Sequence, residues 1–90
     1  MYNLRYSGIF RKQLRLMDKR GKNLTKINHV IECLAENGTL PASYKPHKLK
    51  GEYSGCWEAH IEPDWLIVWQ INENELIILL IATGTHSDLF

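Results

Sequence analysis

The stretch "CWEAHIEPDWLIVWQINENELIILLIAT" (residues 56–83) contains three apolar segments separated by two short polar turns. In residues 56–62 hydrophobic and polar side chains alternate, as expected for a strand with one buried face. "PD" at 63–64 and "NENE" at 72–75 are typical of turns, and residues 65–71 and 76–83 are the strands that follow them. The last segment is apolar on both faces, which is typical of a central strand. The stretch therefore predicts three consecutive strands.

The segments that precede this stretch predict a short strand and two helices. Residues 2–7 alternate loosely and end in a serine suited to cap a helix, which favours a first strand. Apolar side chains recur at helical spacing in residues 8–21 and again between Asn23 and Gly38, so two helices joined by a short link are expected. Residues 39–55 have no period and predict a loop or a short irregular strand.

The predicted order is therefore β-αα-βββ, an α+β fold in which a helical hairpin packs on one face of a small, mostly antiparallel sheet. Ninety residues provide for one domain, residues 1–90. No segment has the length or pattern of a secretory signal or a membrane-spanning helix. Cys33 and Cys56 lack metal-ligand spacing, so we expect a reduced, cytoplasmic protein that does not contact a membrane.

Charge is distributed unevenly along the chain. All 11 Lys and Arg residues lie in residues 1–50 with only three acidic residues, giving +8. Residues 51–90 contain the other seven acidic residues and no Lys or Arg, giving −7. This asymmetry favours a polyanionic partner such as a nucleic acid, although helices that expose lysine to solvent produce the same count.

Three of the four histidines are predicted to converge at one end of the sheet. His29 lies in the middle of a helix and is interpreted as a surface or packing residue. His60 comes near the end of a strand, close to the Asp64 turn, and His47 lies in the loop that leads into that strand. His86 follows the last strand after Gly84, which can bend the chain back over the sheet.

Convergent imidazoles suit proton transfer near neutral pH, because the unperturbed pKa of histidine is about 6.5. They also suit a metal site, but the chain has no H-x-x-x-H or paired Cys/His spacing, so no metal is expected. The remaining interpretation is that these are unrelated polar residues on loops. The chain also lacks a Gly-rich phosphate loop and a recognisable Ser/His/Asp motif.

Basic and aromatic residues flank the predicted histidine cluster. Lys45, Lys48 and Lys50 surround His47, where positive charge could hold a phosphate. Trp65 and Phe90 are placed to stack against unpaired bases, although Trp65 also suits packing in the core. Phe90 is harder to assign to a core, because it is the last residue of the chain.

Three segments carry a resemblance to a known family: "YKPHKLKG" (44–51), "AHIEPDWLIVWQ" (59–70) and "GTHSDLF" (84–90). In order and spacing they resemble the YafQ-type toxins of the RelE/ParE superfamily, whose layout is also β-αα-βββ. The resemblance implies the toxin of a type II toxin–antitoxin pair. Such toxins enter the A site of the 70S ribosome and cut translated mRNA without a metal or other cofactor.

The resemblance also implies a chemistry and a set of partners. The ribose 2′-OH attacks the adjacent phosphate and gives a 2′,3′-cyclic phosphate and a 5′-OH. A cognate antitoxin, expected to be of the ribbon-helix-helix type, inhibits the toxin, and operator DNA is bound only through that antitoxin.

Matching motif positions imply roles for individual residues. The expected catalytic set is His47, His60, Asp64 and His86, with Glu58 a weaker candidate. His86 would be the general acid, His47 or His60 the base, and Asp64 would orient or charge a neighbouring imidazole. The expected substrate contacts are Phe90, Lys48, Lys50 and Trp65.

One position departs from the family pattern. Many relatives have an arginine in an R-x-G-[ST]-H motif, where this chain has Ala82. Either Lys48, Lys50 or another cation substitutes for it, or the enzyme is weak, or the residue was altered so that a toxic protein could be expressed. Two other functions remain open: a ParE-like gyrase poison, and a degenerate toxin that acts only as an antitoxin-binding co-repressor.

Overall fold

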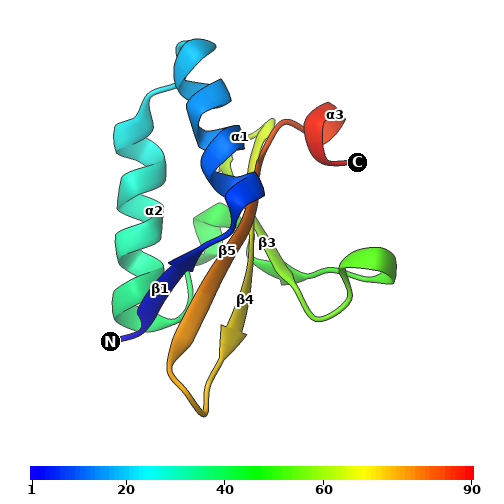
Figure 1. The fold of residues 1–90 in the computed structure, drawn as a ribbon. Helices are drawn as coiled ribbons and strands as arrows, with labels where there is room; N and C mark the ends of the chain where they lie inside the picture. Colours follow the sequence, from blue (N-terminus) through cyan, green and yellow to red (C-terminus); the bar gives the residue numbers. More distant parts are fainter.

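The computed structural model describes residues 1–90, and its main elements follow the predicted order (Figure 1). Strand β1 (Asn3–Tyr6) precedes two helices, α1 (Gly8–Lys19) and α2 (Leu24–Asn37). The other elements are β2 (His47–Lys48), β3 (Trp57–Glu62), β4 (Trp65–Asn72), β5 (Ile77–Gly84) and a C-terminal helix α3 (His86–Leu89), with 3₁₀ turns η1 (Ala42–Tyr44) and η2 (Gly51–Tyr53) on either side of β2.

The five strands form one sheet in the order β1-β5-β4-β3-β2. Strand β1 runs parallel to β5, and the other three pairings are antiparallel. Helices α1 and α2 lie on one side of the sheet, while α3 and the η2 segment lie on the other (Figure 1). The predicted α+β class and mostly antiparallel sheet are confirmed. No helix is both long enough and apolar enough to cross a membrane.

The ends of the two long helices lie where the sequence predicts them, because local residues satisfy their free backbone groups. The side chain of Ser7 accepts a hydrogen bond from the backbone N–H of Phe10 at 2.9 Å and caps α1. The side chain of Asn23 caps α2 in the same way. Gly38 ends α2 in the left-handed conformation, with φ of 71°.

The main hydrophobic core lies between the helix pair and the sheet, and it corrects the prediction for Trp65. This side chain is fully buried in the core, so it is not available to stack against a base. Its indole N–H donates to the Thr83 hydroxyl at 3.0 Å, and that hydroxyl donates to the carbonyl of Leu66 at 2.7 Å. Trp65 is therefore a structural residue, and the prediction that it contacts the substrate is wrong.

Trp65→Phe is expected to lower the free energy of unfolding by about 1–3 kcal/mol, because Thr83 loses its buried hydrogen-bond donor. Thermal and urea unfolding measure this loss. RNA cleavage well below the melting temperature should stay at the wild-type rate. Reduced cleavage by a variant of unchanged stability would return Trp65 to the substrate site.

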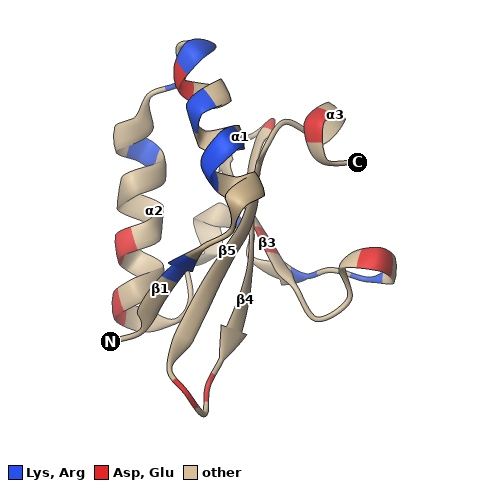
Figure 2. Ribbon diagram, viewed as in Figure 1, with Lys and Arg blue, Asp and Glu red and all other residues tan.

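Basic residues of the first half of the chain form ion pairs with acidic residues of the second half. Figure 2 shows many of the basic residues on α1 and the turn into α2, while acidic residues occupy the β4–β5 turn, η2, α3 and part of α2. Arg20 forms an ion pair with Asp88, and Lys22 and Lys26 both pair with Glu62. Part of the charge asymmetry is therefore neutralised within the fold, next to the elements that hold the histidines.

Candidate active site

Three histidines from different elements lie in a row on the sheet face opposite α1 and α2. His47 belongs to β2, His60 to β3, and His86 is the first residue of α3. The ring centroids of His47 and His60 are 6.4 Å apart, and those of His60 and His86 are 5.9 Å apart. The predicted convergence of the three imidazoles is confirmed. We call these three residues the histidine row.

Asp64 holds the ring of His86 in place. One carboxylate oxygen of Asp64 accepts the backbone N–H of His86 at 3.0 Å and lies 2.6 Å from its ring Nδ1. The backbone hydrogen bond and then the ring hydrogen bond of His86 lower the pKa of Asp64 below its ordinary value. The ionised carboxylate keeps a hydrogen on Nδ1, which leaves Nε2 of His86 as the atom that can exchange a proton.

Asp64 was expected beside His60, but its hydrogen bonds go to His86. His60 is oriented instead by the turn between β3 and β4, because its Nδ1 lies 3.3 Å from the carbonyl oxygen of Pro63. A carbonyl can only accept, so Nδ1 carries the hydrogen. In the neutral ring, Nε2 of His60 then carries the lone pair.

His47 lies between two acceptors. Its Nδ1–H donates to the carbonyl of Lys45 at 2.9 Å, and its Nε2 is 3.3 Å from a carboxylate oxygen of Glu58. Glu58 is only 5% exposed, and its other oxygen has no hydrogen-bond partner. A buried carboxylate is costly without a compensating positive charge, and no Lys or Arg pairs with this one. These two contacts hold the ring of His47 between the Lys45 carbonyl and the Glu58 carboxylate.

Helix α3, which carries His86, was not predicted from the sequence. The Thr85 hydroxyl accepts the backbone N–H of Asp88 at 3.2 Å, and the Asp88 carboxylate accepts the backbone N–H of Thr85 at 2.9 Å. This is a capping box, and the T-x-x-D pattern "THSD" (85–88) was a readable signal for it. Arg20 of the α1–α2 turn donates two hydrogen bonds to the same carboxylate, at 2.6 and 3.0 Å.

Gly84 does not act as a hinge, contrary to the prediction. It pairs with Leu66 as the last residue of β5, and its φ is outside the left-handed region. A Cβ at this position would lie 2.8 Å from Cβ of Asp88. Glycine is therefore needed because α3 packs closely against the end of β5, which fixes the position of His86.

Asp88→Asn is expected to lower stability at pH 7 and to lower it less at pH 3. Hydrogen bonds from Arg20, and then from the Thr85 backbone, hold the pKa of Asp88 far below its ordinary value of about 3.9. Stability from such a carboxyl is complete above its unfolded pKa and is lost as pH falls through the folded pKa. Urea unfolding at pH 7 and pH 3 measures the difference in free energy of unfolding between the wild type and the variant, and this difference should be smaller at pH 3. An equal difference at both pH values would contradict the lowered pKa of Asp88.

The comparisons with known proteins show the family of this chain. A family model described as the bacterial toxin of type II toxin–antitoxin system, YafQ, matches residues 2–90. The chain belongs to the YafQ toxin family. The mRNA interferase toxin YafQ of Escherichia coli K12 is 36% identical over 89 residues, covering 98% of this chain and 95% of the relative.

Solved structures of YafQ toxins have the same fold. YafQ from E. coli BL21(DE3) is 34% identical with a TM-score of 0.92, and the match covers 100% of this chain and 99% of the other. YafQ in the E. coli DinJ–YafQ complex is 35% identical with a TM-score of 0.90, covering 100% and 99%. A metal-bound toxin from Helicobacter pylori is 37% identical with a TM-score of 0.90, covering both chains completely.

The other three residues expected to contact the substrate lie in different parts of this YafQ-family toxin; they are Lys48, Lys50 and Phe90. The ammonium group of Lys48 lies 5.6 Å from the ring centroid of Trp57, whose neighbours belong to the main core. Lys48 therefore points to the sheet face opposite His47, which does not favour a phosphate contact at the histidine row, and its role stays a prediction. Lys50 is exposed, and its role stays a prediction. Phe90 is 60% exposed and packs edge-on against Tyr53 at 5.4 Å, so it is accessible to a base.

Ala82 of this toxin lies in the same cross-strand row as His47. The register places His47 opposite Glu58, Glu58 opposite Val68, and Val68 opposite Ala82. An irregularity in the β4–β5 pairing turns Ala82 away from the helices, and its methyl group is buried beside Cys56 and Val68. A longer side chain at position 82 would therefore extend on the face that carries the histidine row.

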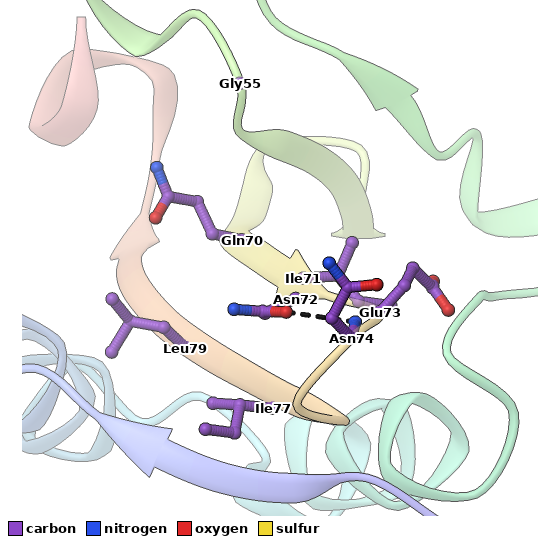
Figure 3. Close-up of a pocket in the computed structure, with 8 residues that line it drawn as sticks. All are labelled: Gly55, Gln70, Ile71, Asn72, Glu73, Asn74, Ile77 and Leu79. Atoms are coloured by element: carbon purple, nitrogen blue, oxygen red, sulfur yellow. Dashed lines mark hydrogen bonds between the residues drawn. The ribbon is translucent and has the colours of Figure 1, made fainter.

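A separate hollow of about 450 Å³ lies by the β4–β5 turn and is lined by Gly55, Gln70, Ile71, Asn72, Glu73, Asn74, Ile77 and Leu79 (Figure 3). It contains no histidine, and its one carboxylate, Glu73, already accepts a hydrogen bond from Tyr2. This hollow therefore offers no imidazole for proton transfer. No group of three or more His, Cys, Asp or Glu side chains in this toxin is arranged to hold a metal ion.

Proposed function

We propose that this toxin is a metal-independent endoribonuclease that cuts translated mRNA in the ribosomal A site. The observation that carries the proposal is the histidine row, in which three imidazoles succeed one another at about 6 Å and His86 is bonded to Asp64. The ribose 2′-OH attacks the adjacent phosphorus, and the bond to the 5′-oxygen of the next nucleotide breaks. The products are a 2′,3′-cyclic phosphate and a free 5′-OH.

His86 is the general acid in this proposal. Its Nδ1–H is held by Asp64, so the proton on Nε2 of the charged ring passes to the leaving 5′-oxygen. Ionised Asp64 stabilises the charged ring before the transfer and keeps the ring in position afterwards. The role resembles that of a carboxylate that orients a catalytic imidazole in other hydrolytic sites.

His60 is the general base, and His47 supplies positive charge. Nε2 of neutral His60 carries a lone pair that can take the 2′-OH proton, because Nδ1 is directed to the carbonyl of Pro63. His47 lies next to His60 in the row with its Nε2 3.3 Å from Glu58, and in its charged form it stabilises the oxygens of the phosphate in the transition state. After each turnover, solvent removes a proton from His60 and returns one to His86.

We infer that a cognate antitoxin binds this toxin, as DinJ binds YafQ in the E. coli complex. The antitoxin type stays a prediction of the ribbon-helix-helix class, and operator DNA is contacted through the antitoxin. Activity on ribosomes places the toxin in the cytoplasm.

One observation favours a second function. Ala82 leaves the phosphate site without the arginine of the family pattern, which would suit a toxin that only binds its antitoxin as a co-repressor. The histidine row has no part in such a function, nor in a ParE-like action on gyrase.

The test is cleavage of a defined mRNA programmed on purified ribosomes, followed by primer extension. We expect cuts in ribosome-bound mRNA and none in the same mRNA without ribosomes. The control is the His86→Gln protein, prepared identically to exclude contaminating nucleases. If neither the wild type nor the Ala82→Arg protein cuts ribosome-bound mRNA, the co-repressor function is favoured.

Added Cu²⁺ or Zn²⁺ is expected to inhibit cleavage. A divalent transition metal bound by imidazole takes the nitrogen lone pair that proton transfer needs. A toxin from H. pylori with the same fold binds a metal, so the effect of metal on cleavage by this toxin is worth measuring. Cleavage is measured at increasing metal concentration, with constant Mg²⁺ for the ribosome and chelator added back to restore the rate. A higher rate with metal would contradict the metal-independent reaction.

A further inference from the structure

Two adjoining hollows extend from the histidine row around the edge of β3 to α2. The first, of about 510 Å³, is lined by His60, Tyr44 and Lys45 among others, and the second, of about 400 Å³, contains His29 and Lys26. Tyr44 and Ile61 line both hollows, so they form one continuous depression. We call it the Tyr44 groove. Each hollow has the size of a small-ligand site.

The groove exists because β2 is short. This strand pairs only with Trp57 and Glu58, so the outer edge of β3 beyond Glu58 has no strand beside it. The turn η1 approaches there instead, with contacts to β3, and brings Tyr44 next to Ile61. An exposed strand edge next to reactive residues is a place where a ligand can be accommodated without rearranging the sheet.

The groove carries net positive charge. Lys22 and Lys26 share the carboxylate of Glu62, with Nζ to oxygen distances of 3.0 and 2.8 Å, and these bonds, first from Lys26 and then from Lys22, lower the pKa of Glu62. Among the residues that line the groove, Lys26 and Lys45 outweigh the single carboxylate of Glu62, and Lys22, which does not line the groove, pairs with Glu62 from beside it. A groove of this charge suits a polyanion.

Lys45 connects the groove to the histidine row. It has a φ of 52°, a left-handed conformation that is uncommon for a residue with a side chain. In this conformation its carbonyl accepts the Nδ1–H of His47, and the residue lines the groove together with His60. Strained backbone of this kind is often associated with functional sites.

We propose that the Tyr44 groove binds the RNA nucleotide next to the scissile phosphate, with its base against Tyr44 and His29 and its phosphate near Lys45 and Lys26. The inference rests on the proposed function and adds a second base contact to that of Phe90. Phe90 belongs to α3 and packs on Tyr53, and neither residue lines the groove. Aromatic and basic side chains along a groove are the combination that binds unpaired nucleotides.

The test begins with binding. The wild-type protein is titrated, by NMR at low salt, with a short single-stranded RNA that contains one 2′-deoxynucleotide at the position of attack, so that it cannot be cut. We expect the amide resonances of Tyr44, Lys45 and Ile61 to shift together with those of His86 and Phe90. If the groove resonances do not move at saturation, or respond to the cognate antitoxin and not to RNA, the inference is wrong.

Three variants refine the test. His29→Ala removes one wall of the groove, and Lys45→Asn removes the cation with a residue that tolerates the left-handed conformation. Each should weaken RNA binding about tenfold, since stacking and phosphate contacts are individually of that size. Asn28→Ala, on the exposed surface of α2 and outside the groove, is the matched control and should bind like the wild type. Wild-type affinity in both groove variants would overturn the inference.

Cleavage on the ribosome distinguishes the inference from the proposed function. With a library of codons, His29→Ala and Lys45→Asn should relax the nucleotide preference at one position next to the cut and keep the preference at the position contacted by Phe90. If RNA shifts the groove resonances but the wild type cuts no mRNA, the proposed function fails and the groove assignment stands. If the wild type cuts and neither groove variant changes rate or preference, the groove assignment fails alone.

Discussion

His86→Gln is expected to reduce cleavage of ribosome-bound mRNA by a factor of about 10²–10⁴, the usual contribution of a positioned general acid. Glutamine has a similar length and can donate a hydrogen bond, but it cannot deliver a proton to the leaving 5′-oxygen. The backbone N–H of residue 86 still donates to Asp64, and the capping box of Thr85 and Asp88 stays intact. The fold of α3 should therefore persist.

Single-turnover cleavage with excess toxin measures this effect, and thermal unfolding of the same preparations checks the fold. Asp64→Asn is an informative companion, because it keeps the hydrogen-bond geometry but removes the negative charge that supports the charged ring of His86. It should be impaired less than His86→Gln. Cleavage at the wild-type rate by His86→Gln would exclude His86 as the acid.

Ala82→Arg is expected to raise the cleavage rate, by up to about 10²-fold, since one cation aimed at developing charge can contribute that much. Position 82 on β5 is separated from Glu58 on β3 by strand β4, a backbone distance of about 10 Å. The side chains of an arginine and a glutamate together are long enough to meet across this distance. The guanidinium would supply Glu58 with a partner for its unpaired oxygen and bring a second cation to the phosphate beside His47.

The matched control is Ala82→Met, which has similar length and no charge. Both substitutions crowd the small cluster of Cys56 and Val68, at a cost of about 1–3 kcal/mol in the free energy of unfolding. Only the arginine should raise the rate in single-turnover cleavage. Equal rates for arginine and methionine would show that a cation at position 82 adds nothing to catalysis.

The sequence predicted the helices and the hairpin strands because these depend on local signals, and the histidine row followed from the order of the elements along the chain. Apolar spacing and capping residues such as Ser7 and Gly38 define the helices. The "PD" turn marks the end of the strand that contains His60 and contains Asp64 itself. Helix α3 was also encoded locally, in the capping box of "THSD", but this signal was read as a bent tail.

The differences between expectation and structure concern residues whose surroundings depend on register or on distant contacts. Lys48 lies beside His47 in sequence, but the pairing of β2 with β3 turns it to the opposite face. Trp65 begins a strand that is apolar on both faces, so its burial could not be decided from alternation. The contact between Asp64 and His86 joins residues from two different turns, and it arises only because β4 and β5 are neighbours in the sheet.

The most direct measurement is the cleavage of ribosome-bound mRNA that contains a single 2′-deoxynucleotide on the 5′ side of the cut. The 2′-OH is the nucleophile of the proposed reaction, so the substituted mRNA should remain intact. The unmodified mRNA should yield a 2′,3′-cyclic phosphate and a 5′-OH. Cleavage of the deoxy-substituted mRNA at the same position, or a product with a 5′-phosphate, would contradict catalysis by the histidine row through the 2′-OH.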